Sequence, residues 1–193
     1  MIINSCKILP CIALAGVIAL PVSCNSALAA ATSTTPEAAL LSRLEAFHGH
    51  VCAGSIFGAR LGLAAKERLK AAGGTGKYTA RYYDLSCPVD GIQVSAGTTY
   101  GNAALVVEDR NEHRLVLTAA GNKLRVEARL TKKAEELGLK SRELLKKAKT
   151  LTSVTRERVL LEREIEEIYT WLKTAPAEQV VVVTMPNGGK VHR

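Results

Sequence analysis

The segment CAGSIFGARLG, residues 52–62, has glycine at every fourth position of a largely apolar stretch. A helix predicted from about Val51 to Ala72 places these glycines on one face. Each glycine costs about 1 kcal/mol relative to alanine inside a helix. Three on one face, Gly54, Gly58 and Gly62, therefore indicate close approach by another backbone or by a ligand. The charged residues of the same helix exclude a membrane span.

The residues just before this helix carry ligand chemistry. FHGHVCAG, residues 47–54, contains His48, His50 and Cys52 within five positions, although the whole chain has only four histidines. Imidazole nitrogen and thiolate sulfur are the ligands that zinc and similar ions prefer. We expect the two histidines to lie in a turn and Cys52 to begin the helix.

A second cysteine lies at the start of another predicted helix. In SCPVDGIQ, residues 86–93, Pro88 suits the first helical position, and the helix should stop at Gly97. A thiol at a helix N-terminus meets the positive end of the helix dipole, which lowers its pKa. Cys52 and Cys87 are both predicted to be such thiols.

These residues permit three kinds of site. Two cysteines with one or two histidines supply three or four metal ligands; three with an open position suit catalysis, and four suit a structural site. Cys52 and Cys87 could instead form a disulfide or a redox-active dithiol. In the third case His48 and His50 only cap backbone groups, and Cys87 is a small buried hydrophobic residue.

Polar residues near Cys87 are candidates for supporting roles. Asp84 and Asp90 flank it and could orient an imidazole that binds a metal, or they could simply cap the helix. Gln93 could bind a ligand in a cleft, or it could be an ordinary residue on the helix surface.

The other elements follow from hydrophobic periodicity and turn residues. Strands are predicted at Tyr78–Asp84, Ala104–Glu108, His113–Thr118, Lys123–Leu130 and Glu178–Met185. Further helices are predicted at 36–47, Thr131–Lys149 and Val154–Lys173, with Thr35 as the N-cap of the first. The second and third strands should form a hairpin, because residues 109–112 favour a turn. This order predicts an α+β domain with a mixed sheet.

The first 29 residues resemble a secretory signal. Lys7 precedes an apolar run, and Ala27-Leu28-Ala29 fits a signal peptidase site. We expect cleavage after Ala29 and export to the periplasm or another extracytoplasmic space. An uncleaved signal or a lipidated Cys24 would be the routes to membrane contact.

Cleavage would leave one domain of about 164 residues. The chain has 26 basic and 18 acidic residues, and residues 1–29 hold one lysine and no acid, so the remaining net charge is +7. Three of the five cysteines would be removed, leaving Cys52 and Cys87. We expect a linker at 30–36, the domain at 37–186 and a basic tail at 187–193. The positive charge of an exported protein does not indicate a nucleic-acid partner. Anionic lipid or cell-wall polymer would be possible partners, and we favour a solvated basic face.

Together, FHGHVCAG and DLSCPVDGIQVSAGTTYGN, residues 84–102, resemble the FmdE family, which takes its name from a component of formylmethanofuran dehydrogenase. The family's pattern is HGHxCPG followed by a C-x-VD-x-IQ segment, and the match runs from about Ala38 to Pro186. The resemblance implies a thioredoxin-like α+β core with a mixed, about five-stranded sheet flanked by helices. It also implies a zinc site and a homodimer. The positions that match the two motifs are His48, His50, Cys52, Cys87, Asp90 and Gln93.

The chain departs from the family pattern in several places. Ala53 replaces the usual proline, and Thr98 stands where many members have cysteine. No cysteine follows Cys87 in this sequence, so we expect the core domain alone, without the C-terminal zinc finger of many members. Because the methanogenic complex is cytoplasmic, the family name does not give the activity of an exported chain.

We therefore predict an exported domain that binds zinc or a similar divalent ion through His48, His50, Cys52 and Cys87. Its role would be metal handling or a metal-assisted reaction on a small-molecule ligand. The alternatives are a thiol-redox module using Cys52 and Cys87, and a non-catalytic structural or binding domain. Whether the protein is an enzyme stays open at this stage.

Overall fold

The structure, a computed structural model, describes residues 36–186. The predicted signal sequence, almost all of the linker with its Thr35 cap, and the basic tail lie outside the described residues. The described residues all fall within one compact unit. None of the helices in this range has the length and apolar character needed to cross a membrane.

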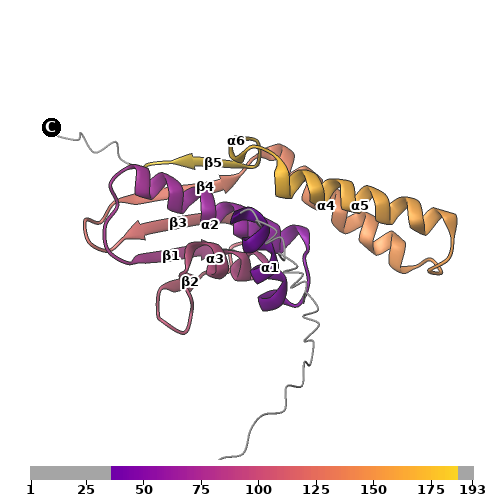
Figure 1. The fold of residues 1–193 in the computed structure, drawn as a ribbon, viewed down its shortest axis with the longest axis horizontal. Coiled ribbons are helices and arrows are strands. Elements are labelled where there is room, and N and C mark those ends of the chain that lie inside the picture. The colour runs from indigo at the N-terminus through magenta and orange to yellow at the C-terminus, as the bar shows by residue number, and fades with distance from the viewer. Residues whose placement is uncertain (1–35, 187–193) are drawn as a thin grey trace, which may run out of the picture. The chain divides into compact units, whose positions relative to one another are not determined.

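Five strands form one mixed sheet in the order β2-β1-β3-β4-β5 (Figure 1). β1 and β2 are parallel, and the other neighbours are antiparallel. The strands are β1 (Tyr78–Tyr83), β2 (Leu105–Val107), β3 (Glu112–Ala119), β4 (Arg125–Leu130) and β5 (Val181–Thr184). The helices are α1 (Pro36–His48), α2 (Ala53–Ala71), α3 (Pro88–Ala96), α4 (Lys132–Lys149), α5 (Arg156–Thr174) and α6 (Ala177–Val180). The predicted α+β class with a mixed five-stranded sheet is confirmed.

The core lies on one face of this sheet. Alternate strand residues such as Tyr82, Leu117 and Val126 are fully buried and belong to one cluster with Ile56 and Leu61 of α2. Residues of the other set lie on the opposite face and form ion pairs across strands there. A sheet with one buried and one solvated face produces the alternation seen in the sequence.

Glycines let α2 and α3 pack backbone to backbone. A Cβ on Gly58 would lie 1.9 Å from the carbonyl oxygen of Pro88, and one on Gly91 would lie 2.3 Å from that of Ser55. At Gly62 it would meet the Ser95 hydroxyl oxygen at 2.1 Å. The close approach predicted from the glycine spacing is therefore confirmed, and the neighbour is another helix.

This contact also sets the direction of the two helices. Gly54 at the start of α2 faces Cys87 and Pro88 at the start of α3, and Gly62 further along faces Ser95 near the end of α3. The helices therefore run the same way with their N-termini level. Cys52 and Cys87, the N-cap residues, are brought together at one end of the pair.

The predicted hairpin between Ala104–Glu108 and His113–Thr118 is wrong. β1 lies between β2 and β3 and pairs with both of them. α3 and the loop after it carry the chain from β1 to the parallel strand β2, as in a βαβ unit. The turn-prone residues 109–112 do not determine which strand β2 pairs with. The packing of α3 places the three-residue β2 beside β1 instead.

Two predicted boundaries also change. His48 is the last residue of α1 rather than part of the turn, which begins at Gly49 with a φ of +84°. The predicted strand at Glu178–Met185 opens instead with the short helix α6, and only Val181–Thr184 is strand. Glutamate and glutamine at its start favour helix over strand.

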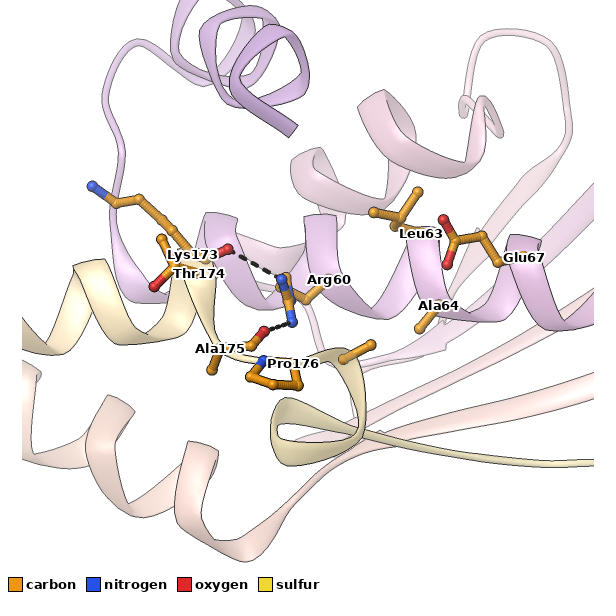
Figure 2. Close-up of a pocket in the computed structure, with 9 residues that line it drawn as sticks. Arg60, Leu63, Ala64, Glu67, Lys173, Thr174, Ala175 and Pro176 are labelled. Carbon is orange, nitrogen blue, oxygen red and sulfur yellow. Dashed lines mark hydrogen bonds between the residues drawn. The ribbon is translucent and has the colours of Figure 1, made fainter. Parts of the chain in front are cut away.

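α4 and α5 form a helical hairpin that extends beyond the sheet (Figure 1). Arg60 of α2 fastens the end of α5, as Figure 2 shows, because its guanidinium donates to the carbonyl oxygens of Lys173, at 3.1 Å, and of Ala175. The last carbonyls of a helix lack partners within it. An arginine from a neighbouring helix therefore satisfies them and holds α5 against α2.

Replacing Gly58 with alanine should destabilise the protein. A Cβ there would lie 1.9 Å from a backbone oxygen, which cannot move without separating the helices. Alanine regains about 1 kcal/mol of helix propensity, but overpacking typically costs about 1–3 kcal/mol and more at rigid contacts. We expect the free energy of unfolding from urea titration to fall by about 2 kcal/mol or more. Gly101→Ala is the control, since nothing lies within 4 Å of a Cβ there; equal stability of the two variants would contradict the packing argument.

Thr98→Val should stabilise the protein. In the described part of the chain, the Thr98 hydroxyl is the one buried side-chain polar atom without a hydrogen-bond partner, and its residue is fully buried. A valine of similar shape removes that unpaired group, which is worth about 1 kcal/mol. Thr131→Val is the contrasting control, since that hydroxyl caps α4 and its loss should cost about 1 kcal/mol. A loss of stability in Thr98→Val, by the same urea titration, would contradict this account.

Candidate metal centre

Three predicted ligands meet where α1 ends and α2 begins. Ligand atoms of His48, His50 and Cys52 all lie within 4.8 Å of one another. α1 brings His48 there, because Leu40 and Leu44 pack with Ala59 of α2. The left-handed Gly49 turns the chain sharply, so that the rings of His48 and His50 lie 4.6 Å apart between centroids.

A chain of hydrogen bonds orients the His48 ring. The Asp90 carboxylate lies 2.6 Å from His48 Nδ1, and Gln93 donates to the other Asp90 oxygen at 3.2 Å. Gln93 in turn accepts from the backbone N–H of Tyr100 at 3.1 Å. A carboxylate at Nδ1 keeps that nitrogen protonated and leaves Nε2 as the free ligand atom.

His48 Nε2 faces the sulfur of Cys52 at 3.8 Å. Ligands of a tetrahedral zinc ion at ordinary bond lengths lie about 3.5 Å apart, so this pair has suitable spacing. Thiolate and imidazole together suit zinc and ions of similar softness. The chemistry and spacing of the three donors therefore fit a bound divalent ion, with His48, His50 and Cys52 as its ligands.

Cys52 is held as an easily ionised thiol. Its sulfur accepts the N–H of Ser55 at 3.4 Å, and the Ser55 hydroxyl accepts the N–H of Cys52 at 3.0 Å, which closes a reciprocal cap on α2. Burial raises the pKa of Cys52, but hydrogen bonds from Ser55, His48 and Cys87 outweigh it and lower the pKa. The pKa predicted for this thiol is confirmed in direction.

Cys87 behaves differently from the prediction. It is the N-cap of α3, but its side chain makes no capping bond, and burial followed by the neighbouring Cys52 charge raises its pKa. Both of these cysteines are free thiols in the structure. Cys87 lies outside the compact group of three donors but interacts directly with Cys52. The structure thus places two thiols with opposite pKa shifts side by side.

Thr98, where the resemblance suggested a missing sulfur, is remote from this group. It follows Gly97, which ends α3 at the opposite end from Cys87. Nine helical residues at 1.5 Å each separate the two ends by about 13 Å. A cysteine at this position would therefore begin at the end of α3 that lies away from Cys87.

Sequence reasoning missed a second imidazole cluster close to Cys87. His113 at the start of β3 lies 2.9 Å from the hydroxyl of Tyr82 and 3.5 Å from Asp84, through Nδ1 in both cases. Asp84, predicted to support an imidazole, therefore lies against His113 rather than against His48 or His50. Ser86 donates to the same carboxylate. The sequence spacing does not identify His113 as a site residue. Only the folding of β3 into the sheet brings it to the cavity that Cys52 and Cys87 line.

A cavity of about 150 Å³ adjoins both cysteines. Its lining includes Cys52, Cys87 and His113, and also Ser141 and Tyr169 from the helical hairpin. The groove in Figure 2 is larger, at about 430 Å³, but its described lining of Arg60, Glu67, Lys173 and largely apolar neighbours contains no sulfur and no imidazole. The thiol and imidazole side chains therefore line the smaller cavity and not the larger groove.

The comparison with known families agrees with this geometry. Residues 47–182 match the family described as "FmdE, Molybdenum formylmethanofuran dehydrogenase operon". This chain belongs to the FmdE family. The matched range contains His48, His50, Cys52 and Cys87, so all four candidate donors lie within the FmdE domain.

Two relatives show how far the likeness extends. The crystal structure of a tungsten formylmethanofuran dehydrogenase FmdE-like protein from Syntrophus aciditrophicus matches with a TM-score of 0.52 and 19% identity, over 79% of this chain and 73% of that one. This likeness shows the FmdE fold alone. A "Probable S-adenosyl-L-methionine-binding protein" of Archaeoglobus fulgidus is 32% identical over 83 residues, 40% of this chain. The match covers only 23% of that relative's length.

Asp90→Asn should lower the pKa of His48. The hydrogen bond to Asp90 is the main reason that this pKa lies above its ordinary 6.5, against the effect of burial. A raised folded-state pKa gives stability that is present below about pH 6.5 and lost as pH rises through the folded value. The stability difference between wild type and variant should therefore be largest in mild acid and shrink above it.

The measurement is an NMR titration of the imidazole signals in chelator-treated protein, with urea unfolding at matched pH. Asp109→Asn, a change of the same charge at an exposed position, is the control and should leave the His48 signal in place. An unchanged His48 titration in Asp90→Asn would contradict the assigned role of the carboxylate.

Proposed function

We propose that this FmdE domain holds zinc or a similar divalent ion through His48, His50 and Cys52, with Cys87 at or beside the fourth position. The role proposed for it is metal handling or a metal-assisted reaction on a small molecule. We also propose that it works after export, as the N-terminal sequence predicts. The observation that carries the proposal is the convergence of three ligand atoms within 4.8 Å, two of them imidazole nitrogens and one a thiol sulfur.

The residues around the donors support this proposal. Asp90 holds the His48 ring so that Nε2 faces Cys52, and Gln93 holds Asp90. The Ser55 cap favours the thiolate form of Cys52. Little reorganisation would therefore be needed on binding, and preorganised ligands bind more tightly.

The four candidate donors differ in exposure. His50 is exposed to solvent, whereas His48, Cys52 and Cys87 are half-buried, and the two cysteines also line the cavity. A bound divalent ion would supply a Lewis acid at this boundary. The chain itself would orient His48, favour ionisation of Cys52 and place the Cys87 thiol against the cavity.

The unequal cysteine pair supports a second candidate function. One thiol has a lowered pKa and its neighbour a raised pKa, as expected of an attacking and a resolving thiol. A thiol-redox module using Cys52 and Cys87 would need a reversible disulfide between them. Metal and disulfide exclude each other at the same sulfurs, so one set of measurements separates the two functions.

The test is the metal and thiol content of mature protein purified without chelators. We expect about one divalent ion per chain, lost in Cys52→Ser and His48→Ala, because each removes a ligand atom. Asp90→Asn should weaken metal affinity by about 10–100-fold, as loss of an orienting carboxylate does. His113→Gln is the matched control, since that imidazole lies outside the donor group, and it should keep the metal.

Acidity should weaken the site. Protons compete for both ligand types, and Asp90 raises the pKa of His48 above 6.5, so affinity should begin to fall in that region as pH decreases. Competition with a chromogenic chelator across this range measures the effect. Absence of metal together with a reversible Cys52–Cys87 disulfide would replace the metal proposal by the redox function. Flat affinity across the range would exclude His48 as a ligand.

A further inference from the structure

The 150 Å³ cavity beside the cysteines is built from elements that are distant in the sequence. The starts of α2 and α3 supply Cys52 and Cys87, β3 supplies His113, and the helical hairpin supplies Arg142 and Tyr169. Gly138 lets α4 cross directly over Phe57, since a Cβ there would lie 2.4 Å from that ring. The hairpin thus forms one wall of the cavity beside the ends of the two helices.

Arg142 is the one side chain of permanent charge among the described residues that line the cavity. Arg142 is an exposed residue, and it takes part in none of the ion pairs found within residues 38–186. It also lines a wider adjoining groove of about 650 Å³, which gives access from solvent. An unpaired arginine at a cavity wall is suited to a carboxylate, because its planar fork donates two parallel hydrogen bonds.

The polar groups beside Arg142 already contact other residues. Burial raises the pKa of Tyr82, and its hydroxyl lies 2.9 Å from His113 Nδ1, the nitrogen that also lies 3.5 Å from the Asp84 carboxylate. Tyr169 interacts with the backbone of Ala53 and with Ser141. The N-termini of α2 and α3 add positive dipole ends.

We propose that this cavity binds a small organic carboxylate, with Arg142 as its anchor. The lining also contains apolar side chains, Phe57 and Leu145, so an organic ligand with a short apolar body fits better than an inorganic oxyanion. A cavity of about 150 Å³ holds a molecule the size of benzene. Butyrate, with the same number of heavy atoms, is of suitable size.

The inference deepens the proposed function and rests on it for any reaction, since the ligand would lie beside the sulfurs of the metal centre. Binding itself depends on residues of the hairpin and sheet that hold no metal. The two proposals can therefore fail separately. Metal content tests the donor group, and carboxylate binding tests Arg142.

The experiment measures butyrate binding by NMR chemical-shift titration of the mature protein, with metal content determined on the same samples. We expect saturable shifts at the cavity residues, and at least tenfold weaker binding in Arg142→Gln, the usual loss for a charged hydrogen-bonded pair. Arg142→Lys should restore part of the affinity, because it keeps the charge but not the fork. Arg163→Gln, the same change at an exposed α5 residue outside the cavity, is the control.

Two further ligands separate charge from shape and carboxylate from phosphate. Butyramide has the size of butyrate without its charge and should bind at least tenfold more weakly. Inorganic phosphate should also bind more weakly, because it leaves the apolar wall unfilled. Equal butyrate affinity in wild type and Arg142→Gln would overturn the proposal. Tighter, Arg142-dependent binding of phosphate would overturn the carboxylate assignment, while loss of metal with butyrate binding intact would overturn only the metal centre.

Discussion

The contact between α2 and α3 is the constraint on which the rest of the structure depends. Gly58 and Gly91 let two backbones touch where any side chain would force them apart. Because the helices run in the same direction, the contact aligns their N-termini and thereby the caps, Cys52 and Cys87. The helix-propensity cost of the glycines, about 1 kcal/mol each, is offset by this close packing. Because α3 connects β1 to β2, the same packing also places β2 beside β1 as the edge strand of the sheet.

The two aligned cysteines differ in pKa, which is lowered for Cys52 and raised for Cys87. Cys52 receives a hydrogen bond from its own helix and faces His48, whereas Cys87 has no capping bond and its pKa is raised by burial and by the neighbouring Cys52. Asp90 belongs to the helix of Cys87 but serves the ring of His48. The segments FHGHVCAG and SCPVDGIQ are therefore linked by two interactions. One is between Cys52 and Cys87, and the other is between His48 and Asp90. A metal centre assembled in this way depends on the α2–α3 contact as much as on its ligands.

The predictions from sequence succeeded where the signal was local. Caps, glycine spacing and strand alternation depend on neighbours within a few residues, so the elements and the positions of Cys52 and Cys87 at helix starts were predictable. Strand pairing was predicted wrongly for the Ala104–Glu108 segment, because its partner is chosen by a crossover and not by the turn after it. The groups around His113 and Arg142 gave no sequence signal, since neither residue belongs to a motif and both reach the cavity only through tertiary packing.

The sequence by itself determined the α+β class, the family and a set of metal-binding residue types, because these follow from short-range patterns. The tertiary structure alone decided which atoms face one another. It placed Asp90 against His48, Asp84 against His113, and Cys87 beside rather than within the group of three donors. The physical reason is that side-chain distances depend on helix register and crossing, which are set by the packing of the whole core. Residue types and spacing specify the available donors, and packing specifies the site.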